Sequence, residues 1–353
     1  MLAVERGLVA LVAVARRVRG RLAGSTGHPG RSLRARVKLA LVRTRDVCPA
    51  CGGPLAAWRS VPSAEPAFGP ARYELRRCRS CGTAVTVGEP PALIHETGAY
   101  SGGDPRLARA AAPVLRAFDR RRLSILSPLA PPPARLLDAG AGRGRFVAGS
   151  LAAGYRARGI EPSLRGVVAA AAIGAPVEQA TIAEATPAPG SFDAVTLWHV
   201  LEHVEDPGAA LARIRTWLRP GGALLVGVPN LGSVQARLGG ERWFHLDVPR
   251  HRVHFTEAGL ETLLRAQGFT PVRTHHLLAE HNPFGMWQSV LSRFTSQPSS
   301  LYNLLKRNAP ARSPDLAITV LALPLAPVAV ITELAAGLAR RGGTIAVLAE
   351  RAP

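Results

Sequence analysis

Hydrophobic residues between positions 135 and 350 gather in short apolar runs, and longer stretches of mixed polarity separate these runs. Runs of this length and composition are typical of strands buried on both faces of a sheet. We expect strands at 136–138, at a segment ending at residue 161, and at 177–181, 194–200, 223–228, 271–277 and 344–350. Strands that alternate with helices predict an α/β fold whose mainly parallel sheet is covered on both faces.

A glycine-rich turn follows the first of these strands. Residues 135–162, RLLDAGAGRGRFVAGSLAAGYRARGIEP, predict a strand, a turn, a helix and a second strand that ends at Glu161. Gly140, Gly142 and Gly144 allow a sharp turn and the close approach of a ligand. A dinucleotide-binding fingerprint would read G-x-G-x-x-G, whereas here the third glycine comes one residue early, which disfavours a dehydrogenase.

The pattern Asp-x-Gly-x-Gly-x-Gly, beginning at Asp138, resembles the first motif of class I S-adenosylmethionine (SAM) dependent methyltransferases, and LRPGG at 218–222 resembles their L-x-P-G-G signature. The resemblance covers roughly residues 100–351 and implies a Rossmann-like seven-stranded sheet in the order 3-2-1-4-5-7-6. It also implies that Asp138 orients the glycine loop and that Glu161 accepts hydrogen bonds from the ribose hydroxyls. Where many relatives carry Asp for the adenine, this chain has Thr181 and Ile182. The full set that we assign to SAM is Asp138, Gly140, Ala141, Gly142, Gly144, Glu161, Pro162, Thr181, Ile182, Trp198 and His199.

All four cysteines of the chain lie in two C-x-x-C pairs, Cys48/Cys51 and Cys78/Cys81. Two such pairs separated by 26 residues are typical of a zinc ribbon, in which four thiolates hold one tetrahedral ion. Because sulfur fills every coordination position, we expect a structural Zn²⁺ and no catalytic role for it. The expected module spans residues 46–90 and precedes a methyltransferase domain at 91–353.

Two histidine-rich segments are candidates for the chemistry. WHVLEHV at 198–204 resembles the x-L-E-H-V segment of small-molecule methyltransferases, including those that act on ubiquinone precursors. Some of these proteins hold a divalent ion with Glu-x-x-Glu-His, but His199 replaces the first Glu here. Whether an ion lies near Glu202 and His203 stays open, and the alternative is that these two residues fix the start of the next helix.

The second segment, RHRVHFT at 250–256, resembles the E-H-x-x-x-F-S segment of sugar C-methyltransferases, which also carry an amino-terminal zinc module. On this match His251 takes the place of the general base that removes the acceptor proton. Histidine titrates near neutral pH and suits that task. His254 and His199 are the next candidates, and for each histidine the alternative is a structural hydrogen bond.

The 353-residue chain has a formal net charge of +20, almost all of it from arginine. Residues 1–45 hold eleven basic residues between Arg6 and Arg45 and no acidic one in that interval. This segment is either a solvated tail or a basic amphipathic helix, at 2–22, on an anionic membrane surface.

About 65 residues intervene between the last two predicted strands, where the minimal family fold has a short hairpin. Within this insertion, at about 278–342, residues 316–332 are uncharged and apolar but contain Pro324 and Pro327. We expect a broken pair of helices, since proline disrupts a regular helix. The pair either covers the active site or enters one leaflet of a membrane. We expect the protein in the cytoplasm, and the second alternative would attach it to the inner face of the membrane.

The favoured function is a SAM-dependent methyltransferase that acts on a small molecule: a sugar, a glycan intermediate, a polyketide or a lipid-linked acceptor. An RNA methyltransferase is the first alternative, because the arginine-rich segment could hold phosphates. It is disfavoured because the Asn/Asp-Pro-Pro-aromatic motif of amino-group nucleic-acid methyltransferases is replaced by WHVL at 198–201. The second alternative is an adaptor that has the SAM fold without catalysis.

Overall fold

The computed structural model describes residues 46–65, 71–91, 105–280, 282–306, 308, 310 and 312–353. These residues belong to one compact unit, Arg45–Pro353. The predictions for the basic segment 1–45, including the amphipathic helix at 2–22, lie outside the described residues.

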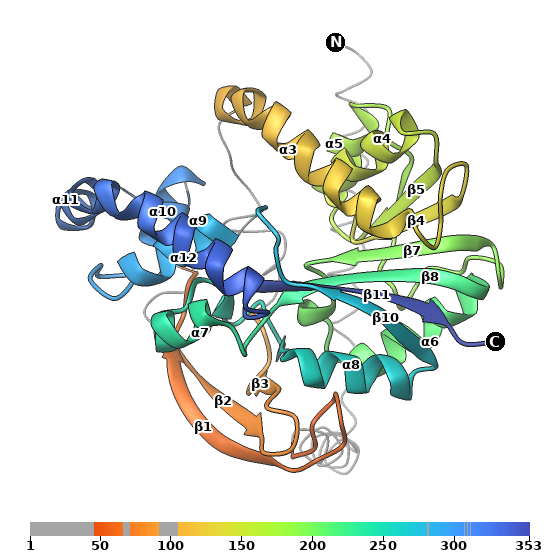
Figure 1. Ribbon diagram of the computed structural model, residues 1–353. Helices are drawn as coiled ribbons and strands as arrows, with labels where there is room; N and C mark the ends of the chain where they lie inside the picture. Colours follow the sequence, from red (N-terminus) through yellow and green to blue (C-terminus); the bar gives the residue numbers. More distant parts are fainter. Residues whose placement is uncertain are drawn as a thin grey trace, which may run out of the picture. The chain divides into compact units, whose positions relative to one another are not determined.

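Seven strands form the larger sheet in the order β10-β11-β8-β7-β4-β5-β6 (Figure 1). The strands are β4 Arg135–Ala139, β5 Arg156–Glu161, β6 Val177–Gln179, β7 Phe192–Trp198, β8 Leu218–Pro229, β10 Phe269–His275 and β11 Thr344–Arg351. The five strands from β4 to β8 run parallel, and β11 is antiparallel to both of its neighbours. Numbered along the chain from the β6 edge, this order is 3-2-1-4-5-7-6, so the predicted topology is confirmed.

Helices cover both faces of this sheet. The elements α3 Pro105–Leu126, α4 Arg145–Ala152 and α5 Leu164–Ala171 lie on one face, while α6 Pro207–Trp217 and α8 Glu257–Ala266 lie on the other (Figure 1). Each face has its own apolar core. Phe146 and Val147 belong to the first, whereas Leu211, Ile214 and Leu264 belong to the second.

The predicted strand at 194–200 ends two residues early. His199 has a left-handed φ of 55°, which interrupts the extended backbone after Trp198. A short 3₁₀ helix, η3 Leu201–His203, follows directly. The extended backbone of β7 therefore ends at Trp198, and the chain turns at His199.

The cysteine pairs belong to a second, four-stranded sheet in the order β1-β2-β3-β9. Its strands are β1 Leu55–Pro62, β2 Arg72–Cys78, β3 Ala84–Thr86 and β9 Val253–His254. The last of these comes from the histidine-rich segment at 250–256 and pairs antiparallel with β3. The small sheet therefore reaches directly into the segment that carries the candidate base.

Short elements connect β8 with β9, and four helices fill the insertion between β10 and β11. The first group is α7 Val234–Gly239, η4 Gly240–Arg242 and η5 Phe244–Leu246. The second is α9 Asn282–Leu291, α10 Ser300–Leu305, α11 Ser313–Ala322 and α12 Ala326–Leu338, with a 3₁₀ turn, η6 Leu323–Leu325, between the last two. The expected break in the apolar segment is confirmed: the helix changes to 3₁₀ geometry at Pro324.

The centre of β5 leaves no room for a side chain at Gly159. A Cβ there would lie 2.5 Å from the Cβ of Ala141 and 3.1 Å from Cγ2 of Val147. We expect Gly159→Ala to lower the free energy of unfolding by about 1–3 kcal/mol, because overpacking shifts the neighbouring backbone. The matched control is Gly149→Ala in α4, whose Cβ would meet only Asp119 atoms, at 3.7 Å and beyond. That substitution should raise stability by about 0.5–1 kcal/mol. Urea unfolding followed by circular dichroism measures both, and an unchanged midpoint for Gly159→Ala would show that this packing is wrong.

Candidate active site

Three glycines form the turn after β4. Gly140, Gly142 and Gly144 have φ values of 81°, 55° and 74°, a region that side chains strongly disfavour. A Cβ on Gly140 would lie 2.3 Å from Cγ2 of Val200, and one on Gly144 would lie 2.6 Å from the Cβ of Ala170. At Gly142 the corresponding space is open, with no atom within 4 Å. The loop is therefore packed on its protein side and open at its middle glycine.

Asp138, the acidic residue of the motif, is buried at the end of β4 and accepts a hydrogen bond from Oγ1 of Thr196 at 2.6 Å. Burial raises the pKa of its carboxyl to about 6 despite this hydrogen bond. Asp138 lies two residues before Gly140, and its role in orienting the loop stays a prediction.

Glu161 lies at the tip of β5 and braces the same loop. Its Oε2 accepts from the backbone N–H of Gly142, and its Oε1 accepts from the backbone N–H of Ser163, both at 2.9 Å. A carboxylate suits this position because both oxygens only accept hydrogen bonds. The carboxylate thus lies beside the open glycine, where the ribose of SAM is expected.

The other residues assigned to SAM lie around this edge of the sheet. Thr181 donates its hydroxyl to Glu184 in the turn after β6, and Ile182 is half-buried against the core. The carbonyl of Pro162 accepts from Nε2 of Gln179. Trp198 ends β7, and the guanidinium of Arg122 lies 4.3 Å from the centre of its ring.

The loop after β7 lies directly on the glycine loop, through the contact between Val200 and Gly140. His199 directly precedes Val200 in this loop, and His203 follows three residues later. Nδ1 of His199 is 3.0 Å from Oε1 of the buried Glu202. The two halves of the predicted site, the cofactor loop and the first histidine segment, are therefore in contact.

A cavity of about 160 Å³ opens beside this contact. Its lining comes from the loop after β7, from the stretch 244–251, from the residues just beyond β1, and from α10 with the residue before it: Ala64, His199, His203, Phe244, His245, Asp247, Arg250, His251, Ser299 and Tyr302. Three of these, His199, Asp247 and Ser299, have left-handed φ values of 55°, 37° and 56°. Among the described residues only Arg340 shares this conformation without being a glycine. Backbone strain of this kind concentrates at functional sites.

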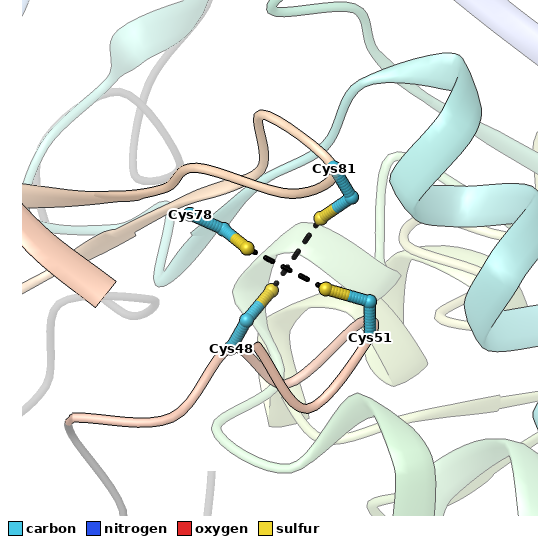
Figure 2. Close-up of side chains that lie close together, drawn as sticks. All are labelled: Cys48, Cys51, Cys78 and Cys81. Carbon is cyan, nitrogen blue, oxygen red and sulfur yellow. Dashed lines mark hydrogen bonds between the residues drawn. The ribbon is translucent and has the colours of Figure 1, made fainter. Parts of the chain in front are cut away.

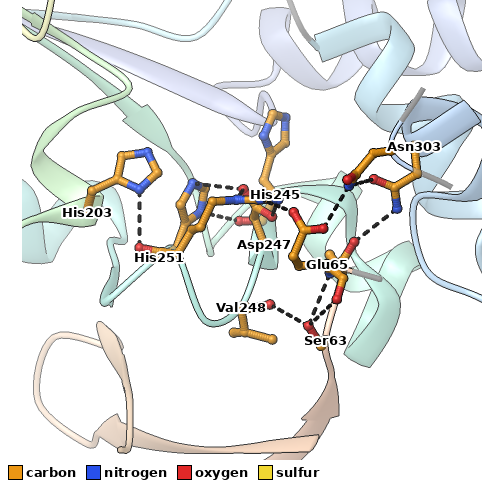
Figure 3. A network of polar contacts seen from close by, with 11 residues as sticks. Ser63, Glu65, His203, His245, Asp247, Val248, His251 and Asn303 are labelled. Atoms are coloured by element: carbon orange, nitrogen blue, oxygen red, sulfur yellow. Dashed lines mark hydrogen bonds and ion pairs between the residues drawn. The ribbon is translucent and has the colours of Figure 1, made fainter. Parts of the chain in front are cut away.

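His251 and His203 face one another in this cavity, with ring centres 4.6 Å apart (Figure 3). Nδ1 of His251 lies 2.9 Å from the carbonyl oxygen of His245, and Nδ1 of His203 lies 3.2 Å from that of Arg250. A carbonyl oxygen can only accept a hydrogen bond, so Nδ1 of each ring carries a proton. A proton taken up from an acceptor molecule would therefore go to Nε2 of the ring.

One carboxylate accompanies these rings. Burial alone would raise the pKa of Glu202, but the hydrogen bond from His199 and the nearby histidines lower it to about 2. Burial and the neighbouring His251 lower the pKa of His203 to about 4, so its ring is neutral at pH 7. One ligand atom each from Glu202, His203 and His251 lie within 4.8 Å of one another, and this set could hold a divalent ion.

A buried ion-pair network forms the opposite wall of the cavity. Arg250 donates to Asp247 through Nε at 2.9 Å, and its Nη1 donates to Glu65, which lies just beyond β1 (Figure 3). Burial would raise the pKa of Asp247, but Arg250 holds it well below its usual range. Nδ2 of Asn303, in α10, donates to the carbonyl of Ala64 at 3.0 Å. The small sheet and α10 are thus both fastened to the cavity.

His254, the second candidate base, does not line this cavity. Its Nε2 lies 3.0 Å from Oγ1 of Thr86, whose hydroxyl donates to the carbonyl of His251 at 2.7 Å. Burial lowers the pKa of His254 to about 3. Its geometry is that of a structural histidine between β3 and β9.

The four cysteines meet at one point, at the end of the small sheet (Figure 2). The Sγ atoms of Cys48 and Cys81 are 3.6 Å apart, and those of Cys51 and Cys78 are 3.4 Å apart. Burial would raise the pKa of Cys78, but backbone N–H groups of Cys81 and Ser80 lower it to about 6. All four ligand atoms lie within 4.8 Å of one another, as the spacing predicts.

Several residues of the cavity could not be found from the sequence. His245 and Asp247 lie between the predicted strand at 223–228 and the segment at 250–256, and no pattern separates them from structural polar residues. Tyr302 lies far away in the chain and carries no motif, and the same is true of Glu65, which bonds to the lining residue Arg250. Tyr302 is brought to the cavity by α10, and burial raises its pKa to about 12.

Comparison with known proteins agrees with this geometry. Residues 108–274 match the family model described as a methyltransferase domain. A ubiquinone biosynthesis O-methyltransferase from Xanthomonas campestris pv. campestris is 34% identical over 124 residues, an alignment that covers 33% of this chain. It covers 52% of that protein, so the chain spans about half the length of the curated relatives it matches.

Solved structures give weaker matches. A SAM-dependent methyltransferase from Thermotoga maritima, described as a possible histamine N-methyltransferase, has a TM-score of 0.42 at 20% identity and covers 70% of this chain and 94% of its own. The 1,6-didemethyltoxoflavin-N1-methyltransferase from Burkholderia thailandensis has a TM-score of 0.40 at 21% identity, with 77% and 96% covered. The family assignment rests on the family model, with which the motif residues and the strand order agree. At residues 108–274 the chain carries a domain of the class I SAM-dependent methyltransferase family.

Proposed function

We propose that this protein transfers a methyl group from SAM to a small-molecule acceptor bound in the histidine-lined cavity. The observation that carries the proposal is the packing of Val200 on Gly140, which joins the cofactor loop to the cavity. Asp138, the three glycines and Glu161 would hold SAM, which supplies an electrophilic methyl group on a sulfonium.

His251 is the residue that we propose to take the acceptor proton. Its Nδ1 is committed to the carbonyl of His245, so Nε2 presents a lone pair. Methyl transfer is an in-line displacement, and the protein chiefly has to align the acceptor and remove its proton. Asp247 lies 3.9 Å from Nε2 of His251 and would stabilise the imidazolium that forms.

The acceptor class that we propose is a sugar, a glycan intermediate, a polyketide or a lipid-linked molecule. The cavity of about 160 Å³ can take part of such a molecule, and its polar lining can bind hydroxyl groups. The partly matching relative is named as an O-methyltransferase of ubiquinone biosynthesis, which supports a small-molecule acceptor. Labelled methyl transfer into an extract of the source cells, followed by separation into lipid, small aqueous and RNA fractions, tests the proposal. Label in RNA would contradict it, and so would the absence of any label.

We further propose that the four cysteines hold a structural Zn²⁺. Tetrahedral zinc with Zn–S bonds of about 2.3 Å places its sulfur ligands about 3.8 Å apart, close to the observed 3.4 and 3.6 Å. The ion would stabilise the small sheet, whose strand β3 pairs with β9 next to the catalytic segment.

Elemental analysis of the purified protein should therefore find about one zinc per chain. Cys48→Ser should lose the metal and lower the thermal midpoint, because the ion stabilises the fold around it. Since the chain has only four cysteines, a thiol reagent should react with them rapidly only after a chelator is added. Full reactivity without a chelator would argue against the metal.

Glu161→Gln tests the cofactor site. The amide keeps the size of the side chain but replaces one acceptor with a donor, which cannot pair with both the loop and a ribose hydroxyl. We expect SAM affinity to fall about 10- to 100-fold. Glu178→Gln, at an exposed position in the neighbouring strand β6, is the matched control. Isothermal titration calorimetry measures both variants, and equal affinities would remove Glu161 from the site.

His251→Asn tests the base. Asparagine can still donate to the carbonyl of His245, but it cannot accept a proton at neutral pH. We expect SAM binding to persist while methyl transfer slows about 10²- to 10⁴-fold. His275→Asn, in β10 and outside the cavity, should transfer at the wild-type rate. The initial rate of label transfer measures the effect, and a wild-type rate for His251→Asn would exclude it as the base.

A further inference from the structure

The helices α11 and α12 expose an unusually apolar surface. Ser313–Leu338 is long and apolar enough to cross a membrane, with a mean hydropathy of 2.0 over 18 residues of which 17% are buried. Length and composition alone are weak evidence, since the core helix of a soluble protein can meet the same test. A core helix, however, is mostly buried, whereas this pair lies on the outside of the described structure.

The polarity of this helix pair is reversed relative to that of a soluble surface helix. The face that packs on the protein carries Asp315, Thr319 and Glu333, together with small residues. The outward face carries large aliphatic residues, and the most exposed are Leu321 at 79%, Leu338 at 75% and Ile331 at 66%. A helix at a water interface places its apolar stripe toward the core. Polar residues toward the protein and aliphatic residues outward are instead typical of helices in lipid.

Both buried acids fasten the helix pair to the same folded unit. Asp315 accepts from the backbone N–H and the hydroxyl of Ser296, at 2.8 and 2.7 Å. Glu333 accepts from the backbone N–H of Gly343 at 2.7 Å and from Nε2 of Gln235 at 3.2 Å. A helix of 26 residues is about 39 Å long, but with both ends attached to one unit it cannot cross a bilayer alone. It can lie in the plane of one leaflet.

The charges around the helix pair favour an anionic lipid surface over a second copy of the chain. Between residues 281 and 349 the only acidic residues are Asp315 and Glu333, and both are buried. Arg312 precedes α11 and Arg340 and Arg341 follow α12, and all three are exposed. A second copy packed through the same helices would bring its own Arg312, Arg340 and Arg341 near those of the first, and like charges oppose self-association.

From these observations we infer that α11 and α12 insert as a pair into one leaflet of an anionic membrane. In Figure 1 the two helices form one extended rod beside α9 and α10. The aliphatic face would enter the acyl region, and the flanking arginines would contact the headgroups. Because α10 lines the catalytic cavity with Tyr302 and also packs on α11, the membrane would lie near the acceptor site.

Flotation of the full chain with phospholipid vesicles tests this inference. The wild-type protein should float with vesicles of phosphatidylcholine and phosphatidylglycerol, and more weakly with phosphatidylcholine alone. Leu321→Asp combined with Ile331→Asp should lower the partition coefficient about 100-fold or more, because it removes two inserted side chains and adds two charges. The control is Val168→Asp combined with Val272→Asp, which adds the same charge at positions 62% and 52% exposed. It should bind as the wild type does.

Other outcomes would overturn the inference. If the first double variant floats as well as the wild type, another part of the chain binds lipid and the helix pair does not. A second contrary outcome is that the wild type fails to float and that Leu321→Asp combined with Ile331→Asp lowers the thermal midpoint by several degrees. The aliphatic face would then be covered by protein and not by lipid. Light scattering would then show whether that protein is a second copy. Vesicle binding needs no methyl transfer, and SAM titration of each variant shows separately whether the proposed enzyme site is intact.

Discussion

The contact between Gly140 and Val200 is the constraint on which the rest of the site depends. Any side chain at position 140 would collide with Val200. The loop after β4 and the loop after β7 can therefore lie this close only because residue 140 is a glycine. This approach sets the cofactor loop against the segment that carries His199, Glu202 and His203. Parallel strands bring their carboxyl ends to one edge of the sheet. The contact between Val200 and Gly140 then joins the two loops at that edge into a single site.

The small sheet and the insertion complete what the central sheet begins. Residues from the loop after β1 and from the insertion lie around the histidines in the cavity lining. Here the pairing of β3 with β9 holds the segment of His251, while Glu65 and Arg250 form a buried ion pair in one wall of the cavity. The helix α10 adds Tyr302 as a further wall. The small sheet and the insertion between β10 and β11 thus both contribute to the cavity. The insertion also carries α11 and α12, the helices that we assign to the membrane.

The sequence predicted the central sheet well because its signals are local. Buried strands, glycine turns and C-x-x-C pairs each depend on neighbouring residues, and the cysteine cluster follows the prediction. The strand order is not a local property, and it was predicted only through the resemblance to the methyltransferase family. The strand end at His199 was missed, because a left-handed φ at a histidine has no signature in the sequence. His254 was a candidate base on spacing alone, but the β3–β9 pairing turns it toward Thr86. Tyr302 reaches the cavity, and Glu65 reaches Arg250, only through tertiary contacts, which no local pattern reports.

The most direct test of the central claim is a crystal structure of the full chain with S-adenosylhomocysteine bound. The account predicts that both ribose hydroxyls lie within hydrogen-bonding distance of Glu161 and that the sulfur faces the cavity lined by His203 and His251. A sulfur that points away from this cavity, or a ribose bound elsewhere, would contradict the claim that the glycine loop and the histidine cavity form one active site.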